Sequence, residues 1–497
     1  MIEPNIYMAL PFGILLAAIA VGPLFLAGWW NRHYEKVSLG LGLIVIAYYL
    51  FSLRAGESVW VTATEFLSFI VVVGSLFVIS GGIHINVKGK ATPVMNVLFL
   101  FVSAILANVF GTTGASMLLI QPWLRMNKYR LTGHHVVFFI FIVSNVGGSL
   151  TPLGPPLLLG YLKGVPFWWV ARNCWPMWLT GVGILLAMFF VADTLNFKKV
   201  PAQVRKVETT REEWRFMGLT NLLFLAVALG AVLVNRPLFF REFIMATAAC
   251  CSYLTTQKHV HEANDFNFGP IKEVAILFAG IFATMMPALD WLKVNAAHLG
   301  QPGPGLFFWG SGALSSVLDN APTYLSFLSA EFGAFVRPET AAAIVSYVKI
   351  HGANLAALDG APHAEQICQA IAALQISHPA DLAASTVSSD HAQMALVLSN
   401  PFYIKCLQAI SMGSVFFGAA TYIGNSPNFM VKAIADHQKA HTPHSWATCS
   451  STPCPTWCQC CWSFGGCSSR EHSAEHRITR IAAGEEIGNE ILNFIEP

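Results

Sequence analysis

Residues 144–162 read SNVGGSLTPLGPPLLLGYL and lie in the middle of a long apolar region. The stretch holds three prolines and four glycines, together with the polar residues Ser144, Asn145, Ser149 and Thr151. Because proline breaks helices and glycine weakens them, it predicts an interrupted helix. Non-helical backbone at membrane depth must be buried in protein or line a watery cavity, so the interruption indicates a polar site.

Composition places the chain among polytopic membrane proteins. Hydrophobic residues make up 55% of the 497 positions and charged residues only 11%, whereas soluble domains average about 45–50% and about 25%. Apolar runs long enough for membrane helices recur, and we expect an all-α protein with about 10–12 membrane segments. No basic, aromatic-rich soluble segment points to nucleic-acid binding. The candidate segments are 6–30, 37–53, 61–83, 93–122, 134–162, 173–193, 216–234, 243–256, 271–290, 305–336 and 402–435.

The basic loops predict the orientation and an unusual segment. Lysines and arginines favour the cytoplasmic side, and they gather near residues 32–36, 88–90, 125–130 and 195–215. Segment 93–122 has a basic loop at each end, so a single crossing would place one of these loops outside. We therefore expect a re-entrant hairpin, with the N-terminus outside and 195–215 inside. The alternative is an ordinary span with one misplaced loop.

The second half of the chain repeats the pattern of the first. The predicted hairpin has a polar tip in ILANVFGTTGASMLL (105–119), and the broken stretch follows it. A second apolar hairpin, with GALSSVLDNAPTYLSFL at 312–328, precedes another broken stretch, FFGAATYIGNSPNFMVKAIA at 416–435. A single cluster of this kind could be a kinked structural helix. Paired interruptions in corresponding positions instead indicate inverted repeats with a transport site near the membrane midplane.

Asp319 is the residue that we single out in this predicted site. A carboxylate at membrane depth is costly and is by default a functional candidate, and one that binds either a proton or Na⁺ can couple two fluxes. Asp319 can also cap the following half-helix, and both roles can hold together. The other candidate ligands for ions or protons carry oxygen atoms: Asn320, Asn108, Thr112, Thr113, Ser144, Asn145, Thr151, Thr323, Thr421 and Asn425. The candidate helix-breaking residues are Gly147, Gly148, Pro152, Gly154, Pro155, Pro322, Gly424 and Pro427.

These motifs resemble the ion transporter superfamily. SSVLDNAPT, SNVGGSLTPLG and AATYIGNSPN are similar to its NhaD-type sodium/proton antiporters and putative citrate transporters, over roughly residues 5–435. The resemblance implies two inverted repeats, a homodimer, an elevator-like movement and a bacterial cytoplasmic membrane. It also implies that Asp319 and Asn320 are hairpin-tip ion ligands.

Sodium/proton antiport is the function that the sequence favours, and sodium-coupled transport of citrate or another carboxylate is the alternative. Carboxylate transporters of this superfamily typically have Ser-Asn-Thr at both tips, whereas this chain has Ala-Asn-Val at 107–109 and Leu-Asp-Asn at 318–320. No lysine or arginine lies inside the interruptions themselves, which Lys163 and Lys432 flank. We expect no enzyme, since GxSxG and HExxH are absent. We expect no cofactor and no metal besides transported Na⁺, and we expect His84, His134 and His135 to be solvated at loop ends.

These segments predict how the chain is divided into two repeats, a linker, an insertion and a tail. A polar, Ala-rich stretch at 337–400 is expected to form short amphipathic helices on the outer face. From about residue 442 the apolar pattern gives way to a cysteine-rich stretch, where the repeat requires one more span. We interpret the tail as the product of a frameshift; a cysteine-rich metal or disulfide knot is the alternative. The expected parts are a first repeat (1–194), a cytoplasmic linker (195–215), a second repeat (216–336), an extramembrane insertion (337–400), a broken helix (401–436) and the aberrant tail (437–497).

Overall fold

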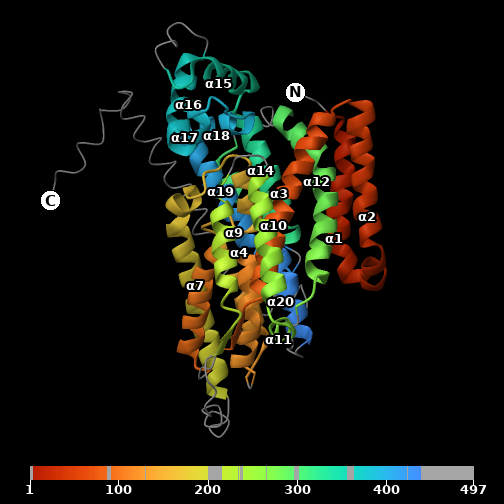
Figure 1. Ribbon diagram of the computed structural model, residues 1–497, viewed down its shortest axis with the longest axis vertical. Coiled ribbons are helices and arrows are strands. Elements are labelled where there is room, and N and C mark those ends of the chain that lie inside the picture. Colours follow the sequence, from red (N-terminus) through yellow and green to blue (C-terminus); the bar gives the residue numbers. More distant parts are fainter. Residues whose placement is uncertain are drawn as a thin grey trace, which may run out of the picture.

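The fold is a bundle of helices with a smaller helical cap at one end (Figure 1). The computed structural model describes residues 4–86, 91–128, 130–199, 215–232, 234, 239–264, 266–295, 302–354, 363–422 and 424–437. Within these ranges, six helices are long and apolar enough to cross a membrane. The prediction of an all-α polytopic membrane protein is therefore confirmed. The cysteine-rich tail and most of the 195–215 linker lie outside the described residues.

The helices follow the predicted segments in order. The first half contains α1 (Leu10–Phe25), α2 (Ala27–Ala47), α3 (Gly56–Gly81), α4 (Pro93–Met126), α5 (Gly133–Phe139), α6 (Pro155–Leu162) and α7 (Trp169–Lys199). The second half contains α9 (Asn221–Val232), α10 (Phe240–Thr255), α11 (Lys258–Ala263), α12 (Gly269–Asn295), α13 (Pro304–Val317), α14 (Asn320–Phe335), α19 (Pro401–Phe417) and α20 (Ser426–His437). One short antiparallel ribbon joins the halves, formed by β1 (His84–Asn86) and β2 (Arg215–Met217).

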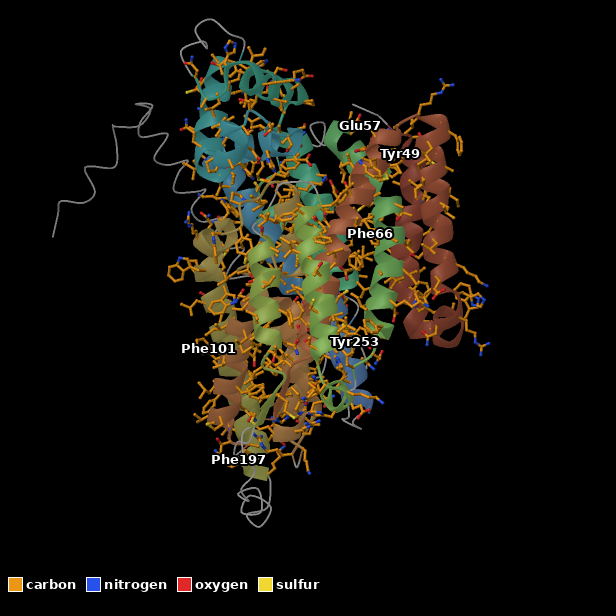
Figure 2. The ribbon with its side chains drawn as sticks, viewed as in Figure 1. Tyr49, Glu57, Phe66, Phe101, Phe197 and Tyr253 are labelled. Carbon is orange, nitrogen blue, oxygen red and sulfur yellow. The ribbon has the colours of Figure 1, made fainter. Side chains whose placement is uncertain are left out.

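Two ends of the bundle can be distinguished. The cap consists of α15 (Pro338–His351), α16 (Ala364–Ser377), α17 (Pro379–Ala383) and α18 (Ser389–Ser399), and the N-terminus lies at this cap end (Figure 1). Tyr49 and Glu57 lie toward the cap end, whereas Phe197 and Tyr253 lie toward the opposite end (Figure 2). We call the opposite end the basic end, because the last turn of α7 carries Lys198 and Lys199 there.

The helix α4 folds back on itself. Gly111 has a non-helical backbone with φ 70° and ψ 161°, which favours glycine. A Cβ at this position would lie 2.6 Å from the carbonyl oxygen of Leu153. A straight helix of this length would span about 51 Å, yet Asn96 Nδ2 donates to Asn127 Oδ1 at 2.8 Å. The two ends of α4 therefore meet at the basic end, and its tip lies inside the bundle.

A second hairpin enters from the cap end. Helices α13 and α14 are joined through the extended residues Leu318 and Asp319. The ring centroids of Phe307, in the first turn of α13, and Phe335, at the end of α14, are 6.1 Å apart. The end of α14 leads directly into the cap. The two hairpins therefore enter the bundle from opposite ends, which is the arrangement of inverted repeats.

Each hairpin is followed by an interrupted helix. The first runs through α5 into a π-helical turn ending at Asn145, unwinds, and restarts as α6 with Pro155 at its first position, where proline is tolerated. The second leaves α19, passes through the extended Thr421, and restarts as α20. Both interruptions therefore coincide with the glycine, proline and asparagine clusters of the sequence.

One loop expected from the sequence is part of a helix. Arg32 and Lys36 were expected between two spans, but both lie within α2. The chain instead turns at Leu26, and α1 and α2 form an antiparallel pair that packs against α12 at the side of the bundle (Figure 1). The apolar run ahead of Arg32 concealed this turn, because the run continues without a break from α1 into the start of α2.

Candidate functional site

The two interrupted helices meet through three asparagines at the centre of the bundle. Asn145 Nδ2 donates to Asn428 Oδ1 at 2.7 Å, and Asn425 Nδ2 donates to Asn145 Oδ1 at 3.1 Å. Asn425 Nδ2 also reaches the carbonyl oxygen of Ser144 at 2.8 Å, and Asn428 Nδ2 donates to the carbonyl oxygens of Gly418 and Thr421. The amides thus supply the hydrogen bonds that the unwound backbone lacks at this depth.

Each hairpin tip packs against the interruption of its own repeat. In the first repeat, Asn108 Nδ2 donates to the carbonyl oxygen of Gly147 at 2.6 Å, and Asn108 Oδ1 accepts from the backbone N–H of Leu150 at 2.9 Å. In the second repeat, the backbone N–H of Asn320 donates to the carbonyl oxygen of Gly424 at 3.0 Å. The structure thus brings together the predicted residues of both hairpins and both breaks.

Asp319 lies at the second tip and faces a cavity. Its Oδ1 accepts a hydrogen bond from the backbone N–H of Ala321 at 3.0 Å, which caps α14. The residue is 7% exposed and lines a cavity of about 550 Å³. The cavity walls come from α1, α2, the part of α4 after its turn, the tip of the second hairpin, and parts of α12 and α20. The capping role and exposure to an ion are therefore compatible.

Several buried oxygen atoms around the tips have no hydrogen-bond partner. Among the described residues, they include the hydroxyl groups of Thr112, Thr113 and Ser149 near the first break, and Oδ1 of Asn320 and of Asn425 near the second. Oxygen atoms are the ligands that hard cations prefer. Such atoms are costly to leave unpaired, so these groups are the best-placed ligands for a transported ion.

Other predicted ligands serve the fold. The Thr151 hydroxyl donates to the carbonyl oxygen of Asn108, and the Thr323 hydroxyl donates to that of Asp319. Thr421 Oγ1 accepts from the backbone N–H of Gly424, and the Ser144 hydroxyl pairs with that of Ser116 at 2.8 Å. These groups hold the interrupted backbone in place.

Asn428 and Ser414 were missed by the sequence reasoning. Asn428 follows Asn425 by three positions across the start of α20, so both amides lie on the same side of the first helical turn. This spacing in NSPN is a signal that could have identified it. Ser414 Oγ is buried without a partner in α19, and nothing in the surrounding sequence distinguishes this serine from structural ones.

In the described part of the chain, four helix N-termini lie around the tips. They belong to the second arm of α4 from Thr112, and to α6, α14 and α20. Thr112 lies next to Gly154, at the start of α6. At the start of α14, the backbone N–H of Asn320 donates to the carbonyl oxygen of Gly424, just ahead of α20. Helix N-termini carry a partial positive charge, so they can stabilise an anion where no basic side chain is present.

An ion-pair cluster stands at the cap end. Lys163 Nζ lies 2.5 Å from Glu65 Oε1 on α3 and 3.3 Å from Asp390 Oδ2 on α18. Burial alone would lower the pKa of Lys163, but the two carboxylates raise it above its usual range, so the amine stays charged. The three residues line a second cavity of about 550 Å³, whose lining does not include Asp319. The cluster therefore links α3, α6 and the cap on the side away from the Asp319 cavity.

We expect Lys163→Gln to loosen this connection. An ion pair of this exposure contributes about 1 kcal/mol. The equilibrium between a cap packed against α3 and α6 and a cap separated from them should therefore shift roughly fivefold. The measurement is the labelling rate of Ser58→Cys, in the same cavity, by a bulky thiol reagent. The exchanged pair Lys163→Glu with Glu65→Lys should slow labelling again, and the exposed Lys349→Gln is the control. Equal rates in all variants would contradict the cluster's role.

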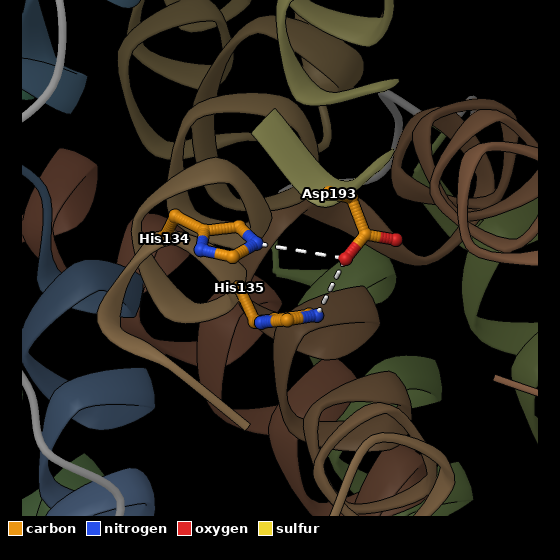
Figure 3. A group of neighbouring side chains, drawn as sticks. All are labelled: His134, His135 and Asp193. Carbon is orange, nitrogen blue, oxygen red and sulfur yellow. Dashed lines mark ion pairs between the residues drawn. The ribbon is translucent and has the colours of Figure 1, made fainter. Parts of the chain in front are cut away.

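A third polar cluster lies near the basic end (Figure 3). His134 Nε2 and His135 Nε2 are 3.6 Å and 3.1 Å from Asp193 Oδ1, and the three ligand atoms lie within 4.8 Å of one another. Both guanidinium NH groups of Arg130 also donate to Asp193. The expectation of solvated histidines is wrong here: the side chain of His135 is fully buried and that of His134 is 18% exposed. His84 is buried too.

The hydrogen bonds of this cluster do not favour a metal ion. The backbone N–H of Thr132 donates to His135 Nδ1, so the proton of a neutral imidazole lies on Nε2, which faces Asp193. A metal ligand needs an unprotonated nitrogen, and Arg130 already neutralises the carboxylate. The cluster is therefore an internal ion pair that fastens α5 and the basic end of α4 to α7.

A family described as "Putative citrate transport" matches residues 2–450, nearly the whole chain. No curated protein matches the chain.

Proposed function

Because the chain belongs to this citrate transport family, we propose that it carries citrate or a similar small carboxylate across a membrane together with a cation. Family membership and the six membrane-length helices make it a multi-pass membrane transporter. The proposal concerns the substrate, the coupling ion and the residues that bind them. It reverses the preference drawn from the sequence, in which antiport came first and carboxylate transport second.

The observation that carries the proposal is the set of helix N-termini around the tips. A small carboxylate could bind there through backbone N–H groups and helix dipoles, although no basic side chain lines the neighbouring cavity among the described residues. The departure from Ser-Asn-Thr at the tips does not remove these groups, since they belong to the backbone. The site could thus hold an anion without a lysine or arginine.

The charges of the cavity require a cation to accompany the anion. Asp319 and Glu273 both line it, and a multiply charged carboxylate would be repelled by them. A cation held by Asp319 and the unpaired oxygens of Asn320 and Asn425 would remove this repulsion. We therefore propose Na⁺ or a proton as the coupling ion, with Asp319 as its principal ligand.

Sodium/proton antiport remains the second candidate. It is favoured by Asp319 itself, a nearly buried carboxylate with no basic partner among the residues around its cavity. A group of this kind can exchange a proton for Na⁺ without any organic substrate. Neither candidate needs a bound cofactor.

The orientation is also proposed. Following the positive-inside rule, the basic end would face the cytoplasm of a bacterium and the cap would lie outside. Asp319 would then be open to the inside in the described conformation. A homodimer with an elevator-like movement remains a proposal that rests on the resemblance.

Uptake of labelled citrate tests the main proposal. Right-side-out membrane vesicles holding the full chain would be given a sodium or a proton gradient, with empty vesicles as the control. Accumulation driven by either gradient supports the carboxylate carrier and identifies its ion. No citrate uptake, together with dequenching of a pH dye by NaCl in everted vesicles, would instead establish antiport.

A further inference from the structure

A row of unpaired polar atoms follows one face of α14. It begins with both amide atoms of Asn320 and ends with both carboxyl oxygens of Glu331, and the Tyr324 hydroxyl, which lies beside Ser411, stands between them. The spacings of four and seven residues place the three side chains on one side of the helix. Buried polar atoms without a partner are rare in folded proteins, and apolar side chains would fill this face of the helix at a lower cost. The presence of these polar groups therefore points to a function.

Glu331 is the residue of this row whose burial costs the most free energy. It is fully buried, and neither carboxyl oxygen has a hydrogen-bond partner. An ionised carboxylate with no partner is very unfavourable in such surroundings, whereas a protonated carboxyl group is tolerated. The geometry therefore requires Glu331 to hold a proton in this conformation.

Among the residues that the structure describes, the neighbouring elements supply no charge that could take the place of the proton. The groups in electrostatic contact with Glu331 are Tyr324 on its own helix and Cys406 on α19, both neutral. Among the described residues of the packed elements, the charged groups are engaged elsewhere or line a cavity. On α12, Lys272 pairs with Glu35, Asp290 accepts from Tyr49, and Glu273 lines the Asp319 cavity. Lys163 beside α6 and Asp390 on α18 belong to the cap-end cluster, and His391 on α18 pairs with Asp381. Lys405 on α19 has an interaction of its own, which does not involve the carboxyl oxygens of Glu331, and α13 has no charged residue.

The position of Glu331 distinguishes it from Asp319. Asp319 precedes α14 and faces the cavity of the basic end, whereas Glu331 lies one turn before the end of α14, beneath the cap. Twelve residues separate the two carboxyl groups, or about 18 Å along the helix. A single rigid helix thus carries one carboxyl group toward each end of the molecule.

We propose that Glu331 is a second proton-binding site of the transporter, which keeps its proton while the Asp319 cavity is open and releases it to water when α14 moves toward the cap end. The step is a proton transfer from the carboxyl group to water, and no electron moves. It would make transport dependent on the pH at the cap end. The inference rests on the proposed transport function, but not on the identity of the substrate.

The first test measures the proton itself. Infrared spectra of the purified full chain should contain the C=O stretch of a protonated carboxylic acid, and Glu331→Gln should remove it. Glu339→Gln is the matched control, because Glu339 is an exposed acid in the first turn of α15. A band unchanged by Glu331→Gln would overturn the proposal even if citrate is not the substrate.

The second test measures how citrate exchange in proteoliposomes depends on the pH at the cap end. A site that exchanges its proton only with water at the cap end carries no proton across the membrane, so in Glu331→Gln the rate of exchange of labelled for unlabelled citrate should no longer depend on that pH, while exchange itself continues. A wild-type pH dependence in this variant would overturn the proposal, as would equal loss of exchange and citrate binding at every pH. If Glu331→Gln does not fold, Glu331→Met removes the buried polar atoms at similar volume, and the same outcomes apply.

Failure of the proposed function would look different. Wild-type protein that transports no citrate, but moves protons in response to NaCl, would refute the carboxylate carrier. The infrared comparison, and the loss in Glu331→Gln of the dependence of that proton movement on the pH at the cap end, would still decide the role of Glu331.

Discussion

Asp319→Asn should abolish ion-coupled transport while leaving the hairpin folded. Asparagine caps a helix about as well as aspartate, so the bond to the backbone of Ala321 can persist. The negative charge that would hold the coupling ion is lost. Removing a charged ligand of this kind costs roughly 3 kcal/mol, so coupled flux should fall by about 100-fold.

The matched variant is Asp319→Ala, which removes both the charge and the cap. It should lose transport to the same degree and should also unfold more readily, by about 1 kcal/mol. Flux in vesicles and thermal unfolding of the purified protein measure the two effects separately. Coupled flux near the wild-type level in Asp319→Asn would show that the coupling ion binds elsewhere.

Arg130→Met should strongly destabilise the basic end. Arg130 and Asp193 are both buried, and the guanidinium donates to both carboxylate oxygens. Removing the arginine leaves the carboxylate without its charged partner, which typically costs about 3–5 kcal/mol. The expected result is a large fall in the unfolding temperature and in the yield of folded protein from membranes.

A second variant separates the ion pair from the packing. Arg130→Met with Asp193→Leu removes both charges and should recover most of the lost stability, because a buried pair can often be replaced by apolar residues. A double variant as unstable as Arg130→Met alone would mean that Asn96, which also donates to Asp193, and the two histidines need the carboxylate for their own hydrogen bonds.

The sequence predicted the hairpins and breaks because their signals are local. Proline and glycine constrain the backbone of their own segment, and basic residues at both ends of 93–122 constrained its topology. The tight turn at Gly111 also follows from composition, since few other residues adopt its conformation. The central features of the fold could therefore be read without long-range information.

The roles of individual polar residues could not be predicted in this way. Asn108 and Asn425 were both predicted as ligands, yet both the nitrogen and the oxygen of the Asn108 amide form hydrogen bonds, whereas Oδ1 of Asn425 has no partner. The difference depends on which distant backbone reaches each side chain. The burial of His135 has the same cause, because its partner Asp193 lies on another helix 58 positions later.

Glu331 was overlooked for a related reason. It was read as part of the apolar hairpin 305–336, without regard to the face of the helix that it occupies. Only the packing of α14 against α19 and its other neighbours shows that the carboxyl group has no partner and no solvent. A charged residue inside an apolar hairpin is nevertheless a signal that could have been used.

The interpretation of the tail remains a prediction. The family match ends at residue 450, near the start of the cysteine-rich stretch. Resequencing the gene around codon 444 would decide between a shifted frame and a genuine tail. A final apolar helix in the corrected frame would complete the second repeat.

The asparagine contact between the two interrupted helices has a consequence for biosynthesis. Asn425 is 280 residues beyond Asn145, so a ribosome that adds about 5–20 residues per second needs roughly 14 to 56 seconds to reach it. During this interval the first interruption is already made but lacks the amide that satisfies it. Lipid cannot supply that hydrogen bond. The early segments must therefore wait in a sheltered or still hydrated environment near the insertion machinery until the last helices arrive.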